Sequence, residues 1–202
     1  MVKKVEYSLM SNFDHYRWTT LCIHQYLLTT IPAAVKDIFA RGYNSSLTFS
    51  RRNFICALQF FQNHSFSQFK QLVDIAVYDR PGKRYRFTIL YHLLSIHYGN
   101  RITGLVQTDE LTDLPSVTSQ YSSAGWQERE VWDLFGIYFT NHLDLRRILT
   151  DYGFSGFPLR KDFPLTGFLE VFYSDEQKRV VYQPVELSQE FRNFNYSSPW
   201  ET

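Results

Sequence analysis

Three carboxylates lie close together within one segment that is predicted to be helical: Glu128, Glu130 and Asp133. Paired carboxylates can act as general acid and base when their environments separate their pKa values. Such chemistry also needs a nucleophile, a metal ion or a cofactor beside the pair, and the flanking sequence offers none. On a helix, Arg129 and Asp133 are four residues apart and can form an ion pair. We therefore interpret the group as packing and docking at an interface, with a solvated helix face as the alternative and catalysis as the least favoured interpretation.

Metal binding is the second chemistry to weigh, because His142 and Asp144 stand close together. A third ligand at a suitable spacing is missing, and the six histidines do not cluster along the chain. The two cysteines, Cys22 and Cys56, are too few for an iron–sulfur cluster and lack the paired spacing of a structural zinc site. We predict no metal site. We predict that both cysteines are buried free thiols in a reducing compartment, with a structural disulfide as the less favoured alternative.

Nucleotide and hydrolase motifs are also missing from the sequence. It contains no G-x-G-x-x-G after a strand, no P-loop, no G-x-S-x-G and no H-E-x-x-H. Residues 83–87, KRYRF, interleave cations with aromatics as single-strand nucleic-acid modules do. A net charge of +1, however, provides no field that would recruit a nucleic acid. We predict no catalytic residue, no cofactor-binding residue and no nucleic-acid partner for this chain.

Basic and acidic residues alternate over residues 144–162. The set comprises Arg146, Arg147, Arg160, Lys161, Asp144, Asp151 and Asp162. Its balanced charge argues against a phosphate-binding track, whereas planar guanidiniums pair well with a partner's acids and carbonyls. Near the C-terminus stands Trp200, and aromatic side chains of this kind often anchor interfaces. We predict that these residues contact a partner protein, with ordinary packing at a domain surface as the alternative.

The carboxylates need a helix to position them, and the sequence predicts one over residues 125–135. Ser122 and Ser123 precede it as N-cap residues, and Gly136 ends it. Before it, residues 69–79, 85–97 and 101–108 have strand-forming composition, and a Pro-Gly turn separates the first two. Strands joined by a tight turn are antiparallel, because a parallel crossover needs a dozen or more residues. These elements predict an α+β fold with a mixed or antiparallel sheet and flanking helices.

Nearer the N-terminus, the spacing of apolar residues predicts helix over residues 13–40, in which Pro32 either breaks the helix or starts a second one. A short strand at 47–49 and a helix over 51–63 follow. Residues 112–119 are expected to form a loop. Beyond residue 138 the periodicity stops. From residue 153 onward glycine and proline recur every few residues, and only a hairpin around residues 174–177 is indicated. A long irregular segment is unusual inside a compact domain. We therefore predict two parts, a domain over residues 1–138 and an extended arm over 139–202 that wraps a partner subunit.

Composition sets the remaining bounds. With 202 residues, 44% hydrophobic and 20% charged, the chain has the make-up of a globular protein. The longest apolar run, residues 87–96, is far short of the roughly 20 residues that span a bilayer. The N-terminus has neither a secretory signal nor an import signal, so we expect a soluble chain made where it works. The aromatic content of 18% reflects either an aromatic-rich core and interface or codon bias in an AT-rich genome.

A spaced pattern runs through the helix and the segment after it: an ERE triplet, an acid, two bulky apolar residues, a His or Lys, and a basic–apolar–apolar ending. The matching positions are Glu128, Arg129, Glu130, Asp133, Leu134, Phe135, His142, Arg146, Ile148 and Leu149. A further run matches at Asp151, Tyr152, Gly153, Gly156, Pro158, Arg160, Lys161, Asp162, Phe163, Pro164 and Gly167. In these motifs, residues 69–201 resemble the thirty-kilodalton subunit family of NADH:quinone oxidoreductase (respiratory complex I), whose members are called the C subunit or NADH dehydrogenase subunit 9. Leu143 stands where family members usually have Pro, Phe157 where they usually have His, and residues 171–173 lack a usual Arg.

The resemblance implies an α+β domain with a mixed sheet followed by the arm, as a core subunit of the quinone module in the peripheral arm. In that family this subunit holds no cofactor, and FMN and the Fe–S clusters belong to partner subunits. It braces the large hydrogenase-like subunit of forty-nine kilodaltons (the D subunit), beside neighbouring Fe–S subunits, in an H⁺-translocating NADH:ubiquinone reductase. The implied location is the matrix side of the mitochondrial inner membrane with an organelle-encoded chain, or the cytoplasmic side of a bacterial inner membrane. The corresponding subunit of a membrane-bound hydrogenase-type complex is the alternative, and the long C-terminal arm favours the NADH:quinone enzyme.

Overall fold

The computed structural model describes residues 6–7, 26, 29–41, 44–194 and 200. The chain divides into two compact units, Met1–Lys161 and Asp162–Thr202. This division falls later than the boundary expected at 138/139, because hydrogen bonds set out below hold residues 144–161 to the first unit. That the chain beyond it wraps a partner remains a prediction.

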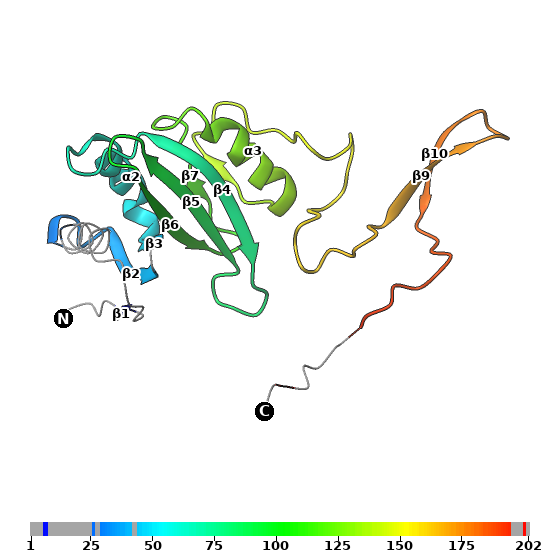
Figure 1. The fold of residues 1–202 in the computed structure, drawn as a ribbon. Helices are drawn as coiled ribbons and strands as arrows, with labels where there is room; N and C mark the ends of the chain where they lie inside the picture. Colours follow the sequence, from blue (N-terminus) through cyan, green and yellow to red (C-terminus); the bar gives the residue numbers. More distant parts are fainter. Residues whose placement is uncertain (1–5, 8–25, 27–28, 42–43, 195–199, 201–202) are drawn as a thin grey trace. The chain divides into compact units, whose positions relative to one another are not determined.

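A six-stranded mixed sheet forms the first unit, in the order β1-β2-β3-β6-β5-β4 (Figure 1). Its strands are β1 (Glu6–Tyr7), β2 (Val35–Arg41), β3 (Asn44–Phe49), β4 (Gln71–Asp79), β5 (Phe87–Ser95) and β6 (Asn100–Thr108). The pairs β4–β5 and β5–β6 are antiparallel as the turns predicted, whereas β3 lies parallel to β6. The mixed sheet is therefore confirmed, and so are the strands expected near residues 47–49, 69–79, 85–97 and 101–108.

Two helices pack on one face of this sheet: α2 (Phe54–Asn63), which follows the short 3-10 helix η1 (Arg51–Asn53), and α3 (Ala124–Phe135). The ring of Phe54 in α2 lies 4.6 Å from that of Tyr91, and the ring of Phe135 in α3 lies 6.3 Å from that of Phe87. Phe87 and Tyr91 are an even number of residues apart in β5, so their side chains point to the same face. The α+β class with flanking helices is confirmed.

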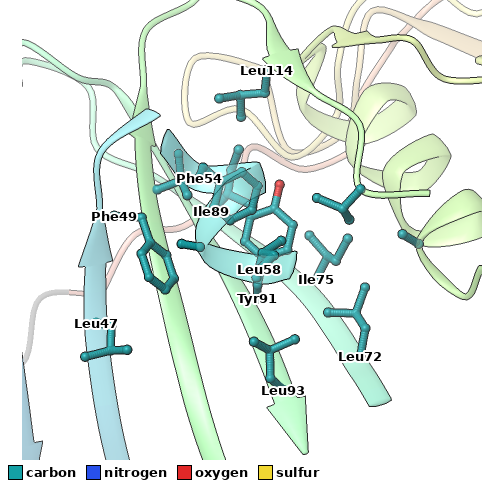
Figure 2. Close-up of a cluster of buried hydrophobic side chains, with 14 of the residues drawn as sticks. Leu47, Phe49, Phe54, Leu58, Leu72, Ile75, Ile89, Tyr91, Leu93 and Leu114 are labelled. Carbon is teal, nitrogen blue, oxygen red and sulfur yellow. The ribbon is translucent and has the colours of Figure 1, made fainter. Parts of the chain in front are cut away.

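The core lies between α2 and the sheet, and Figure 2 shows it as a cluster of aliphatic and aromatic side chains. The labelled members are Leu47, Phe49, Phe54, Leu58, Leu72, Ile75, Ile89, Tyr91, Leu93 and Leu114. A Cβ at Gly104 would lie 2.5 Å from the ring of Phe49, so only glycine lets that ring rest on β6. Burial, and secondarily the charge of Glu128, raises the pKa of the Tyr91 hydroxyl.

Helix α3 ends as predicted and begins differently. Gly136 is left-handed, with φ 74°, and its N–H donates to the carbonyl of Trp132 at 3.0 Å. At the other end Ser123 makes no side-chain cap, and its hydroxyl donates to the carbonyl of Leu72 in β4 at 3.2 Å. The serine side chain before the helix therefore does not cap it, because this hydroxyl serves the neighbouring strand.

Two other expectations need correction. Residues 35–40 form strand β2 rather than the end of a helix, because they pair with β3 after the chain turns at Pro32; residues 8–25 lie outside the described residues. Cys56 is exposed, because the buried residues of α2 lie on its opposite face, and Cys22 lies outside the described residues. The loop expected at residues 112–119 contains β7 (Leu114–Pro115), which pairs in parallel with β8 (Phe139–Thr140).

The second unit is built around one antiparallel hairpin, β9 (Leu169–Ser174) with β10 (Arg179–Pro184). This confirms the hairpin expected around residues 174–177. Among the described residues of this unit, none is buried. Over the described parts of both units, no helix is long and apolar enough to cross a membrane.

Candidate protein interface

Asp133 is the centre of the motif-bearing segment, and its side chain is completely buried. Its Oδ2 accepts hydrogen bonds from the backbone N–H groups of Ile148 (3.2 Å), Leu149 (2.7 Å) and Thr150 (2.9 Å). Its Oδ1 accepts from the Thr150 hydroxyl at 2.6 Å. Burial by itself would raise the pKa of this carboxyl, but the hydrogen bonds from Thr150, Leu149 and Ile148 outweigh it and lower the pKa. An ionised Asp133 thus fixes an irregular loop to the end of α3.

Arg147 completes this group from the loop side. Its Nη1 lies 3.3 Å from Oδ1 of Asp133 and donates to the carbonyl of Gly156 at 3.1 Å. Its guanidinium also lies over the ring of Phe157, 5.1 Å from the centroid. One cation therefore connects the helix, the loop and the following bend.

The ion pair predicted between Arg129 and Asp133 is wrong, because Asp133 is already occupied by the loop. Arg129 instead donates from Nε to the carbonyl of Arg146 at 3.1 Å, and its guanidinium lies 4.8 Å from the ring centroid of Trp126. Arg146 in turn pairs with Asp144 at 2.9 Å on the surface.

Glu128 is the second buried carboxylate of α3. Its Oε1 accepts from the N–H of Val117 at 2.7 Å, and its Oε2 accepts from the hydroxyl of Ser116 at 2.6 Å. Burial raises the pKa of Glu128, and the bonds from Ser116 and Val117 offset part of that rise. Because Ser116 and Val117 directly follow β7, this side chain ties the helix to the small β7–β8 sheet.

His142 lies beside Glu128, with 3.8 Å between its Nε2 and Oε2 of Glu128. Its Nδ1 accepts the N–H of Asp144 at 3.1 Å, so Nε2 carries the hydrogen that points to the carbonyl of Gly125, 3.1 Å away. The pair His142 and Asp144, weighed above as metal ligands, is thus a local turn. Among the described residues no group of three His, Cys, Asp or Glu could hold a metal ion.

Arg160 reaches back to the same helix from the far end of the segment. Its Nε donates to the carbonyl of Phe135 at 2.7 Å, and its guanidinium lies between the rings of Phe157 (4.6 Å) and Phe87 (5.3 Å). The ring of Phe157, which departs from the family pattern, therefore makes cation–π contacts with two guanidiniums, those of Arg147 and Arg160.

The end of the first unit is anchored on Asp79 of β4, whose side chain is buried. Arg86 binds it through two nitrogens, at 2.7 and 2.8 Å, and the backbone N–H of Lys161 donates to it at 2.9 Å. The Arg86 guanidinium foremost, and then the Lys161 N–H, hold the pKa of Asp79 below its usual range against the effect of burial.

The remaining predicted residues lie at the surface. Glu130 is exposed and lines, with Asp74 of β4, a cleft of about 200 Å³ between that strand and α3. Asp151 is exposed and accepts the N–H of Tyr152, while Asp162 and Trp200 are exposed in the second unit. The structure thus brings together Asp133 with Arg147, Glu128 with His142, and Arg129 with Arg146.

Sequence reasoning missed the residues that satisfy the buried carboxylates, namely Ser116, Thr150 and Arg86, and it missed Asp79 as a third such carboxylate. Ser116 is 12 positions from Glu128, and Thr150 is 17 positions from Asp133, so no helical or strand period connects them. A signal was available for Glu128, which lies on the same helix stripe as Ala124, Val131 and Phe135, since a buried carboxylate needs such partners.

Around this internally bonded framework, large apolar side chains point outward. They are Trp126, Tyr138, Leu143, Leu149, Tyr152 and Leu159, all exposed. Leu143, the second departure from the family pattern, is 97% exposed, and Tyr152 is fully exposed. The arrangement presents a rigid, partly apolar surface without an activated nucleophile among the described residues.

Comparison with known proteins decides the family. Residues 47–169 match the family described as respiratory-chain NADH dehydrogenase, 30 Kd subunit. The chain belongs to this family. It is 56% identical over 166 residues to NADH-ubiquinone oxidoreductase subunit 9 of Reclinomonas americana, covering 82% of this chain and 81% of that protein. The C subunit of NADH-quinone oxidoreductase from Paramagnetospirillum magneticum is 54% identical over 181 residues, covering 88% and 89%.

Solved structures agree with the family fold. A trypsin-resistant fragment (1–134) of Nqo5 superposes with a TM-score of 0.54 at 28% identity, over 63% of this chain and 99% of the fragment. A chain of an archaeal membrane-bound sulfane sulfur reductase shares the fold, with a TM-score of 0.62 at 24% identity, over 72% of this chain and 86% of that one. A further relative, 48% identical over 180 residues and covering 89% of this chain and 94% of that protein, is NADH dehydrogenase [ubiquinone] iron-sulfur protein 3 of Beta trigyna.

Proposed function

We propose that this member of the family is a non-catalytic core subunit of the quinone module in the peripheral arm of complex I. It braces the large hydrogenase-like subunit that forms the quinone site, and so supports NADH-to-quinone electron transfer coupled to proton pumping. In this proposal FMN and the Fe–S clusters are held by partner subunits, and the complex is on the matrix side of the mitochondrial inner membrane.

The observation that carries this proposal is the exposure of the second unit. Many large apolar residues among its described residues are exposed: Leu165, Phe168, Leu169, Val171, Phe172, Tyr173, Val180, Tyr182, Leu187, Phe191, Phe194 and Trp200. Extensive exposed apolar surface marks an interaction site in soluble proteins. Fully burying one such side chain contributes roughly 1.5–3 kcal/mol, and a single two-stranded hairpin is marginal by itself in water. A partner surface that covers β9 and β10 buries these apolar side chains and so supplies the stabilisation that the hairpin lacks by itself.

The first unit contributes a different kind of surface to the proposed interface. Asp133 and Glu128 direct their carboxyl groups to internal hydrogen bonds, so the side chains that face outward beside them are held on a fixed backbone. Trp126 with Arg129 stacked on it, and the exposed Tyr152, have the composition of interface anchors. In the proposal they meet the partner directly, as do Glu130, Arg146 and Lys161 of this unit and Asp162 of the second unit.

A truncation separates the two contributions. A chain ending at Lys161 keeps the six-stranded sheet, α2, α3 and every hydrogen bond to Asp133, so we expect it to fold with the far-UV spectrum of an intact α+β domain. We also expect it to be missing from complex I on native gels, with quinone reduction falling in proportion to the assembled complex. Normal assembly of the truncated chain, or normal yield with reduced turnover per complex, would contradict the scaffold role.

Point variants give a finer version of the same test. Phe172→Asp places a charge on the exposed apolar surface of β9, whereas Glu176→Lys changes charge in the hairpin turn beyond the paired residues. We expect the first variant to lower incorporation severalfold and the second to leave it unchanged. Equal incorporation of the two would show that the apolar surface of β9 is not covered by the partner.

A further inference from the structure

The turn between β4 and β5 is a concentrated positive surface in a chain whose charges otherwise balance. Residues 80–86 contain Arg80, Lys83, Arg84 and Arg86 and no acid, although the whole chain has a net charge of +1. Residues 80–84 are all exposed, and Figure 1 shows the turn projecting past the ends of the two strands. We call residues 80–85 the basic turn.

Two acids next to this turn, Asp79 and Glu110, are paired with Arg86. Asp79 accepts two hydrogen bonds from the guanidinium of Arg86 and one from the N–H of Lys161. Glu110 lies 2.5 Å from Nη1 of Arg86 and 3.7 Å from Nη1 of Arg160. Because the charge of Arg86 is directed at these carboxylates, the charges of Arg80, Lys83 and Arg84 are left to act outward.

The turn is also held in one shape. The N–H of Arg80 donates to the carbonyl of Arg86 at 2.9 Å, the N–H of Lys83 donates to the carbonyl of Arg80 at 3.3 Å, and Gly82 supplies a φ of 88°. Two of its guanidiniums rest on aromatic rings. The guanidinium of Arg84 lies 5.6 Å from the centroid of Tyr85.

Arg80 is held most firmly of the three cations. Its guanidinium lies 4.9 Å from the centroid of Tyr78, and its Nη2 donates to the hydroxyl of Thr88 at 3.1 Å. A guanidinium fixed before binding loses less freedom when it meets a carboxylate, and its planar fork suits two parallel hydrogen bonds.

From this geometry we infer that the basic turn docks onto a carboxylate-rich surface of a neighbouring subunit of the complex. The inference rests on the proposed function and adds the chemistry of one partner surface to it. Three cations on a narrow tip fit a cluster of Asp and Glu side chains. Polybasic lipid-binding segments carry about 4–8 cations, and single-strand nucleic-acid binding uses a groove that follows the backbone, with bases stacked along it.

The test measures incorporation of the purified full-length chain into complex I in membranes that lack this subunit. The variant Lys83→Glu/Arg84→Glu reverses the charge at the tip of the basic turn. The control variant Lys36→Glu/Lys70→Glu makes the same change of charge at two exposed lysines elsewhere. Charges at an interface rim act mainly on the association rate and are screened by salt. We expect about tenfold slower incorporation of the turn variant at about 50 mM salt, less than about twofold at about 500 mM, and no change for the control variant.

Several outcomes overturn the inference. Equal rates for the two double variants at low salt would show that the basic turn meets no acidic surface. Unchanged incorporation together with lost binding to phosphatidylserine-containing vesicles, or to a single-stranded oligonucleotide, would assign the turn to a membrane or a nucleic acid. If the wild-type chain itself fails to incorporate, the proposed function fails with it, whereas a defect confined to the turn variant supports both. Matching far-UV spectra of all three chains establish that each is folded.

Discussion

Residues 128–161 and the second unit both contain many aromatic residues and little regular structure after α3, but they are built in opposite ways. The first region has three glycines and one proline, and the second unit has one glycine and three prolines. In the first region, buried Glu128 and Asp133 collect the hydrogen-bond donors of an irregular chain and fix it to α3. In the second, the described residues include no buried side chain, and the regular structure is one hairpin. The difference shows that irregular chain becomes a rigid surface when a buried acceptor gathers its N–H groups.

Removing that acceptor should have the largest effect. Asp133→Ala leaves three backbone N–H groups and the Arg147 guanidinium without their carboxylate. Breaking a buried charge group in this way costs about 3–5 kcal/mol. We expect that loss in the free energy of unfolding by urea, with faster amide exchange over residues 147–150.

The matched control is Asp144→Ala, which removes an exposed carboxylate paired with Arg146. Exposed pairs contribute under about 1 kcal/mol. Similar losses for the two aspartates would mean that the buried carboxylate is not what holds the loop.

The close approach of the bend to α3 can be tested at Gly136. An added Cβ there would lie 2.6 Å from the Phe157 ring and 2.8 Å from Nη2 of Arg160, at a φ of 74°. Gly136→Ala is expected to cost about 2–4 kcal/mol through crowding and left-handed strain together. Gly153→Ala shares the positive φ, 70°, with open space around it, and should cost only about 1–2 kcal/mol. Calorimetry of the two variants separates the backbone strain, which both share, from the crowding by Phe157 and Arg160, which only Gly136→Ala has. Equal Tm shifts would argue against a close packing of Phe157 on Gly136.

The two buried carboxylates should respond to pH with opposite signs. The folded pKa of Asp133 lies below its ordinary 3.8, so its contribution to stability is present above that pH and is lost as pH falls. The folded pKa of Glu128 lies above its ordinary 4.5, so its contribution is complete below that pH and is lost as pH rises through the raised value.

Neutral variants make this contrast measurable. Relative to the wild type, Glu128→Gln should gain unfolding free energy as pH rises from about 4 to 7, and Asp133→Asn should lose it as pH rises from about 2 to 5. Urea titrations at four or five pH values provide both slopes. Parallel pH dependences would overturn the assignment of an ionised Asp133 beside a hard-to-ionise Glu128.

The smallest expected effect on stability is at the outer surface. Trp126 is 68% exposed and contacts Arg129 through its ring. Trp126→Ala should change the unfolding free energy by under about 1 kcal/mol, the range of an exposed cation–π contact, while lowering incorporation into complex I. If Trp126→Ala instead lowers the unfolding free energy by several kcal/mol and incorporation falls with it, Trp126 is a structural side chain and not an interface anchor. Lys70→Ala, another exposed position on this unit, is the control.

Part of the fold could be predicted from the sequence, because it depends on interactions between residues close together along the chain. Strands β4, β5 and β6 follow from composition and turns, the end of α3 follows from Gly136, and the β9–β10 hairpin follows from two β-prone runs. These features depend on residues within a few positions of one another. The spaced motif beginning at Glu128 likewise indicated the family.

Tertiary structure alone decided how the motif residues are used. Residues 35–40 became a strand because β3 was available as a partner, against the helical spacing of the sequence. Asp133 does not pair with Arg129, which lies four positions away on the helix, because its carboxylate accepts hydrogen bonds from four donors of residues 148–150. Arg147 and Arg160 were expected to meet a partner's acids. In the structure they donate hydrogen bonds to α3, Arg147 to the carboxylate of Asp133 and Arg160 to the carbonyl of Phe135. A buried carboxylate recruits donors by proximity in space, and proximity across 12 to 17 positions has no period in a sequence.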